Sequence, residues 1–145
     1  MFLKELSKDE SMCFLNLVST FARVDNKFAE EEKRLIANYK EELGIKDEEV
    51  KFIEYRDIMD LLKNCDYRAK SIIYFELVGV ALVDGDLEVS EIDFLDKIAE
   101  EFEITRAKRI AIANYFYDFD DIYNFTTITT NSNIQLLKEK AEIIL

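Results

Sequence analysis

The chain has no proline and only three glycines among its 145 residues. These two residue types most often end or kink a helix, so few positions force a break in helical structure. Apolar residues recur every three to four positions along almost the whole chain, and no stretch alternates as a strand would. The sequence therefore predicts an all-α protein, and its length fits a single compact domain over residues 1–145 with about seven helices.

Capping residues mark several helix boundaries. Ser7 and Glu10 have the spacing of a capping box, which predicts that the first helix begins there. Gly44 is a natural end for the second helix, because glycine adopts the left-handed backbone of a C-cap. We expect a third helix to start near Asp47, and we expect Ser90 to cap a later helix.

Residues 72–83 are apolar on nearly every side of a helix, which predicts a central helix surrounded by the others. Glu76 is the one charged residue in this run. A buried carboxylate needs a partner, a gap to solvent or a shifted pKa, and the first two of these are the usual outcomes.

The chain matches itself at an offset of 59 residues. Residues 22–45 and 81–104 share seven identities in 24 positions, and their apolar positions fall in the same register. Each copy fits a helix, a short acidic loop and a second helix, so the repeat halves span about 8–45 and 67–104. The sequence therefore predicts an internal helix–acidic loop–helix duplication.

The second loop is rich in oxygen ligands of the kind that Ca²⁺ and Mg²⁺ prefer. Its acids are Asp84, Asp86, Glu88 and Glu91, and Gly85 supplies a turn. The glycine and glutamate positions of an EF-hand are not matched.

In the first loop Asn26 and Lys27 stand where the second has Gly85 and Asp86. A metal-free explanation of the second loop stays open. Ser90 would cap the following helix, while Glu91 and Asp93 would suit its positive N-terminal end.

The chain resembles the tellurite-resistance TerB-like family at these residues. The resemblance rests on Ala81, Asp84, Gly85 and Glu91, with a weaker copy from Ala22 to Glu32, and it covers roughly residues 15–110. It implies an all-α fold of about seven helices, an acidic cluster built from two loops, and an association with tellurite and stress resistance.

Metal binding is proposed for that cluster in the family, so the resemblance implies a site for a divalent cation, Ca²⁺ or Mg²⁺. Carried over to this chain, the candidate metal ligands are Asp25, Glu32, Asp84 and Glu91, and Asp86 joins them from its position in the loop.

The charge of the chain excludes several classes of partner. It has 31 acidic and 19 basic residues, a formal net charge of -12. Nucleic acids and anionic membranes carry the same sign, so neither is expected as a partner. No apolar run is long enough to span a bilayer, and nothing resembles a signal peptide, so we expect a cytoplasmic protein. Cys13 and Cys65 fit buried free thiols, with a disulfide between them as the alternative.

The chain has no histidine, no nucleophile motif and no glycine-rich phosphate loop, so we expect a non-enzymatic protein. Metal-assisted hydrolysis by carboxylates alone is a minor alternative. The leading hypothesis is a stress-response-type sensor or scaffold with a divalent-cation site formed by the two acidic loops. The alternative is a metal-free interaction module that presents an acidic face to a basic protein partner. The sequence does not indicate an oligomeric state.

Overall fold

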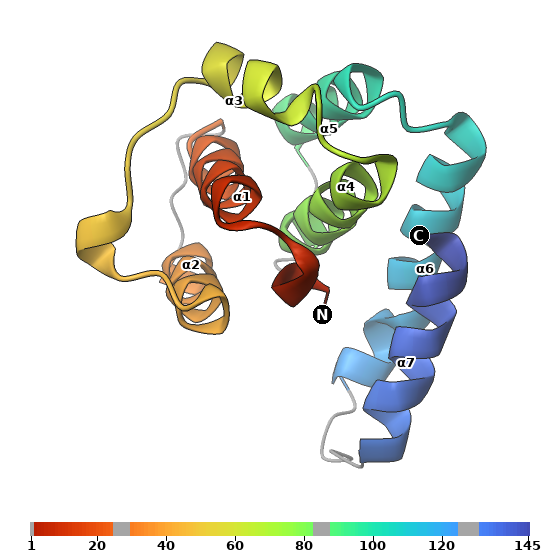
Figure 1. The fold of residues 1–145 in the computed structure, drawn as a ribbon. Coiled ribbons are helices and arrows are strands. Elements are labelled where there is room, and N and C mark those ends of the chain that lie inside the picture. The colour runs from red at the N-terminus through yellow and green to blue at the C-terminus, as the bar shows by residue number, and fades with distance from the viewer. Residues whose placement is uncertain (1, 25–29, 83–87, 125–130) are drawn as a thin grey trace. The chain divides into compact units, whose positions relative to one another are not determined.

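The computed structural model describes residues 2–24, 30–82, 88–124 and 131–145 (Figure 1). All regular structure in these ranges is helical, which confirms the predicted all-α class. The elements are η1 (Leu3–Glu5), α1 (Lys8–Ala22), α2 (Glu30–Leu43), η2 (Asp47–Glu49), α3 (Tyr55–Leu62), α4 (Tyr67–Leu82), α5 (Val89–Glu101), α6 (Arg106–Asn124) and α7 (Asn131–Ile144).

The chain divides into two compact units, Met1–Glu103 and Ile104–Leu145. The first unit holds η1 through α5, and the second holds α6 and α7. The single domain expected over residues 1–145 stays a prediction.

Two central helices, α1 and α4, form the core of the first unit. Residues 71–78 of α4 are all buried, which confirms the prediction for this segment, and Glu76 is buried with them. Residues 11–18 of α1 are also all buried, which the sequence did not predict. A helix buried on every side needs neighbours around its whole circumference. Within this unit, α1 packs against α2, α3 and α4, and α4 also packs against α5 (Figure 1).

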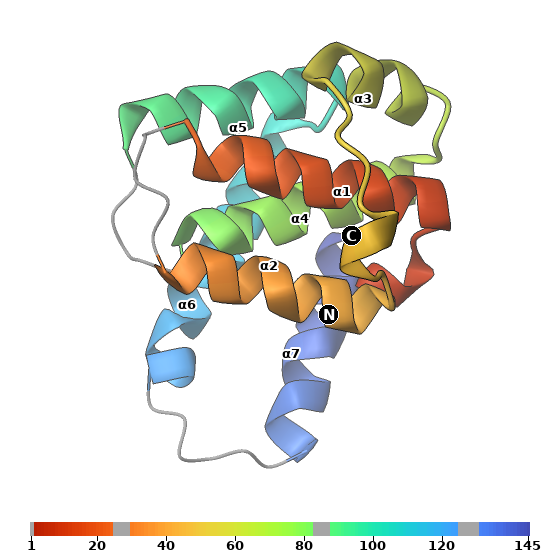
Figure 2. The ribbon, with the colours of Figure 1, turned by 90° about the vertical axis from the view of Figure 1, so that its left-hand side faces the viewer.

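Aromatic contacts fix these helices to one another. The rings of Phe14 in α1 and Tyr39 in α2 meet edge to face, with centroids 5.0 Å apart. The rings of Phe21 in α1 and Phe94 in α5 lie 5.8 Å apart. Such pairs stabilise a core beyond the area that they bury. Figure 2 shows α5, α1, α4 and α2 running roughly along one direction, with α3 across one end of α1.

The predicted caps of the first two helices are confirmed. The Glu10 amide donates to Ser7 Oγ at 3.2 Å, and the Ser7 amide donates to Glu10 Oε2 at 3.1 Å. Gly44 ends α2 with a φ of 66°. The Ile45 amide then donates to the Lys40 carbonyl at 2.9 Å, as in a Schellman motif.

The helix bounds recur at the offset that the sequence predicts. Helix α4 begins 59 residues after α1, and α5 begins 59 residues after α2. The left-handed residues Gly44 and Glu103, which follow α2 and α5, are also 59 positions apart, with φ values of 66° and 55°. This agreement supports the alignment of the two helix pairs, while their origin by duplication stays a prediction.

The expected start of the third helix near Asp47 is wrong. Only the short η2 forms there, residues 50–54 are irregular, and α3 begins at Tyr55. The local pattern favours helix, but a side chain distant in sequence holds the backbone of this segment in a different conformation.

That side chain is Asn16 of α1, which is buried with 7% of its surface exposed. Its Nδ2 donates to the Lys51 carbonyl at 2.9 Å, and its Oδ1 accepts the Ile53 amide at 2.9 Å. A further bond from Nδ2 to the Met12 carbonyl, also 2.9 Å, orients the amide on α1. The Lys51 carbonyl and the Ile53 amide thus bond to the buried Asn16 side chain rather than within a helix.

In the second unit, α6 and α7 pack against each other. Tyr115 of α6 donates its buried hydroxyl to the Leu137 carbonyl of α7 at 3.2 Å. Lys108 Nζ donates to the Leu145 carbonyl at 3.2 Å, near the start of α6 and just after the end of α7. The two bonds thus join the helices of this hairpin near their middle and at the chain end of α7.

We expect Asn16→Ala to lower the free energy of unfolding by about 2–3 kcal/mol. The change removes three hydrogen bonds worth about 1 kcal/mol each and leaves the Lys51 and Ile53 backbone groups without this partner. Asn38→Ala is the matched control, because Asn38 lies exposed on α2. Urea denaturation followed by circular dichroism measures both. Equal effects of the two substitutions would contradict a structural role for the Asn16 amide.

Candidate docking pocket at the C-terminal ends of helices α3 and α5

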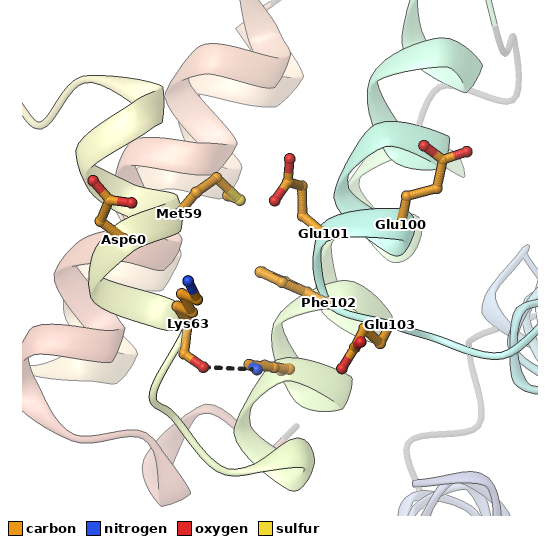
Figure 3. Close-up of a pocket in the computed structure, with 8 residues that line it drawn as sticks. Met59, Asp60, Lys63, Glu100, Glu101, Phe102 and Glu103 are labelled. Atoms are coloured by element: carbon orange, nitrogen blue, oxygen red, sulfur yellow. Dashed lines mark hydrogen bonds between the residues drawn. The ribbon is translucent and has the colours of Figure 1, made fainter.

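A pocket of about 580 Å³ opens in the first unit where α3, α4 and α5 meet (Figure 3). This volume falls within the range of about 300–1,000 Å³ that is usual for ligand sites. Its lining comes from the end of α3, the first turn of α4 and the end of α5. The lining residues are Met59, Asp60, Lys63, Lys70, Glu100, Glu101, Phe102 and Glu103.

Apolar side chains from two helices line part of the pocket. Phe102 is 2% exposed and follows the last turn of α5. Met59 lies on α3 and is half-buried. Figure 3 shows both side chains directed toward the space between α3 and α5. A ligand would thus meet hydrocarbon as well as charge.

The rest of the lining is dominated by carboxylates. Asp60, Glu100, Glu101 and Glu103 are all exposed, and none forms an ion pair with any residue that the structure describes. Four carboxylates against two lysines give the lining a formal net charge of −2.

The two lysines differ in their contacts. Lys70 Nζ donates to the Lys63 carbonyl at 3.1 Å, and this bond ties the first turn of α4 to the end of α3 (Figure 3). A lysine that binds a carbonyl at a helix end also suits the negative pole of that helix. The Lys63 ammonium group is exposed and forms no ion pair within the described ranges.

Helix polarity adds to the negative potential. Both α3 and α5 end at the pocket, and neither has a basic residue in its last turn. The unbonded carbonyl groups of a helix C-terminus carry about half a negative charge, and acidic side chains there are unfavourable by about 0.3–1 kcal/mol each. Glu100 and Glu101 in the last turn of α5 therefore oppose its macrodipole.

The one base of α5, Lys97, does not neutralise these acids. Its Nζ lies 4.4 Å from the centroid of the Tyr55 ring, a cation–π contact. Burial raises the pKa of Tyr55, and the negative charge of Glu101 raises it further. The Tyr55 hydroxyl is buried and has no hydrogen-bond partner among the described residues.

Glu103 has an unfavourable backbone conformation. Its φ is 55°, a left-handed value that costs roughly 1 kcal/mol for a residue with a side chain. Gly44 occupies the aligned position after α2, where no atom would come within 4 Å of an added Cβ. The chain thus keeps a charged residue at a position of the pocket where glycine would be less strained.

The predicted metal-ligand set falls mostly outside the described residues. Asp25, Asp84 and Asp86 lie outside them, and Glu32 lies in α2 with its side chain outside the description. Among the described residues, no three acidic or cysteine side chains are placed to hold a metal ion. The metal site stays a prediction.

Glu91 is the one predicted ligand whose side chain is described. It is 2% exposed, and its Oε2 accepts the Glu88 amide at 2.8 Å. This bond caps α5, whose N-cap is Glu88 and not Ser90 as expected. The helix begins earlier than expected because the Glu91 side chain reaches back to the amide three residues before it.

Both cysteines are free thiols, as expected, but only Cys13 is buried, while Cys65 is part-buried. Burial raises the pKa of Cys13 to about 11, so this thiol stays protonated at neutral pH. A protonated, buried thiol is a poor nucleophile and a poor metal ligand.

No helix in the described ranges is both long enough and apolar enough to cross a bilayer. Comparison with protein-family models, with curated proteins and with solved structures finds no match to this chain. The resemblance to the TerB-like family therefore stays a prediction.

The pocket was not predicted from the sequence. One feature of the sequence could have indicated it. Three glutamates, Glu100, Glu101 and Glu103, fall at the end of a helix, where acidic side chains oppose the helix dipole. The other wall, from Met59 to Lys63, is joined to α5 only by the tertiary fold.

We expect Glu103→Gly to raise the free energy of unfolding by about 1 kcal/mol, because it relieves the left-handed strain and removes a charge from a helix C-terminus. Gly44→Ala, which adds strain at the aligned position, should lower it by a similar amount. Thermal and urea denaturation measure both. Destabilisation by Glu103→Gly would show that the Glu103 side chain contributes to folding.

For the metal hypothesis, chelator-stripped protein should bind Ca²⁺, Mg²⁺ or Mn²⁺ saturably in a calorimetric titration. Asp84→Ala and Glu91→Gln should each weaken binding at least about ten-fold, because each removes a charged oxygen ligand. Glutamine at position 91 keeps an acceptor for the Glu88 amide, so the fold is preserved. Glu103→Gln is the charge-matched control. Absence of binding at millimolar ion would contradict the site.

Proposed function

We propose that this protein is a non-enzymatic interaction module that binds a basic segment of another protein in the pocket between α3 and α5. The observation that carries the proposal is a set of four carboxylates at the C-terminal ends of two helices, none of which forms an ion pair with a residue that the structure describes. A cationic side chain placed there would meet carboxylates and helix carbonyl groups together.

The proposal accounts for charges that work against stability. Glu100 and Glu101 oppose the dipole of α5, and Glu103 has a strained backbone. Natural proteins retain such unfavourable features mainly where a binding site requires them. The apolar contribution of Met59 and Phe102 favours a peptide segment over a bare metal ion, since the hydrocarbon stems of lysine and arginine pack on apolar surface.

The charge of the whole chain supports the same class of partner. A net charge of -12 attracts basic surfaces at long range and speeds their encounter with the pocket. Lys63 and Lys70 offset part of the negative charge of the lining.

A divalent-cation sensor or scaffold is the second candidate. It is favoured by the recurrence of the helix bounds at the 59-residue offset, which gives both acidic loops the same place between their helices. A stress-response role rests on the TerB-like resemblance alone. Both candidates make the acidic surface functional without a catalytic step.

A fluorescein-labelled hexa-arginine peptide tests the proposal by fluorescence anisotropy at about 0.15 M salt, where distant charges are screened. We expect saturable binding that Glu100→Gln and Glu103→Gln each weaken about three-fold, the loss of one exposed ion pair. Glu41→Gln is the matched control, because Glu41 aligns with Glu100 and lies outside the pocket.

Equal weakening by Glu41→Gln and Glu100→Gln would show that the peptide follows net charge and not the pocket. That result would reject the proposal. Circular dichroism confirms that each variant is folded before it is compared.

A further inference from the structure

One face of α5 continues the pocket outward as a stripe of exposed residues. Val89, Asp93, Asp96 and Glu100 follow one another at intervals of four, three and four positions, so they lie on one side of the helix. All four are exposed, and Val89 has 74% of its surface open. Ile92, beside the stripe, is 40% exposed.

The stripe is apolar at one end and acidic at the other. Val89 and Ile92 lie in the first turn of α5, and Asp93, Asp96 and Glu100 follow toward its C-terminus. Glu100 also lines the pocket, so the stripe and the pocket form one continuous surface. From Val89 to Glu100 this surface is about 17 Å long, at 1.5 Å per helical residue.

The acids of the stripe are not neutralised by the protein itself. Asp93, Asp96 and Glu100 form no ion pair with any residue in the described ranges. The one base of α5, Lys97, lies over the Tyr55 ring instead. Acids three and four positions apart on a helix repel one another, so this face carries uncompensated charge that a cationic partner would relieve.

The exposed aliphatic end distinguishes this face from an ordinary solvated one. Val89 and Ile92 lie one helical turn apart at the end of an acidic stripe, and their exposed surface gains free energy when a partner covers it. A second copy of this chain is a poor occupant, because two chains of charge -12 repel and the stripe would meet its own acids. Charge complementarity requires a basic partner.

We propose that this face docks a short basic segment of a partner protein in one orientation, with an aliphatic end on Val89 and Ile92 and a basic end in the pocket. About six extended residues span the 17 Å surface, at about 3.3 Å per residue. The inference rests on the proposed function of the pocket and adds to it the length, polarity and composition of the bound segment.

Two labelled peptides test the orientation by fluorescence anisotropy. The first has two isoleucines followed by four arginines, and the second has six arginines. We expect Val89→Ser to weaken binding of the isoleucine-ended peptide about five-fold, since the contact with its apolar end is lost, and to leave hexa-arginine unchanged. Glu103→Gln should weaken both peptides, because both fill the pocket.

The control for the apolar end is Phe52→Ser, at a residue 75% exposed and outside α5. It should leave both peptides unchanged, and equal losses from Phe52→Ser and Val89→Ser would overturn the inference. A third peptide, with the two isoleucines in the middle of the four arginines, should bind less tightly than the isoleucine-ended one. Equal affinity of the third peptide and the isoleucine-ended peptide would also overturn the inference.

The outcomes separate this inference from the function on which it rests. If Glu103→Gln weakens both peptides while Val89→Ser affects both alike or neither, the pocket binds basic residues and the oriented stripe is rejected. If neither substitution changes binding of either peptide, the pocket and the stripe are both rejected.

Asp96→Lys adds a second measurement. It should weaken binding of both peptides and raise the melting temperature of the protein, because it removes repulsion between acids along α5.

Discussion

The side-chain amide of Asn16 ties the segment that precedes α3, one wall of the pocket, to the buried helix α1. It lies buried in the middle of α1 and bonds to backbone groups at Lys51 and Ile53, more than thirty positions away. These bonds keep residues 50–54 out of a helix and so determine where α3 begins. Helix α3 then carries Met59 and Asp60 to the pocket. Loss of the amide would free the connection that positions this wall.

Electrostatic strain is concentrated on the other wall. The last turn of α5 carries acids where a helix prefers bases, and the only base of the helix lies over the Tyr55 ring. Glu103 adds a left-handed backbone at the rim. Each feature costs a small part of a total stability that is itself only about 5–15 kcal/mol in a typical domain. Their location around a single cavity is better explained by binding of a cation than by the needs of folding.

Local chemistry made parts of the structure predictable. The Ser7–Glu10 cap and the end of α2 at Gly44 are local features that depend only on neighbouring residues, and both are confirmed. The apolar run of α4 was long enough to indicate burial on every side, also correctly. The expected start of α5 was two residues too late, because Ser90 is also a residue type that favours the N-cap. The Glu91 side chain accepts the Glu88 amide, and this bond makes Glu88 the N-cap. The candidate metal ligands came from the TerB-like resemblance, with Asp86 added from its position in the loop. Only Glu91 among them has a described side chain, and this side chain already caps α5.

The sequence by itself determined the helical class, the main caps, the 59-residue spacing of the helix pairs and the excess of acid. These properties follow from residue types and from interactions within a few positions. Only the tertiary structure decided that Asn16 interrupts a helical pattern at residues 50–54, that Lys97 lies over Tyr55, and that the ends of α3 and α5 meet. The physical reason is that these contacts join segments far apart in the chain. Packing of two fully buried helices brings them together, and no local preference contains that information.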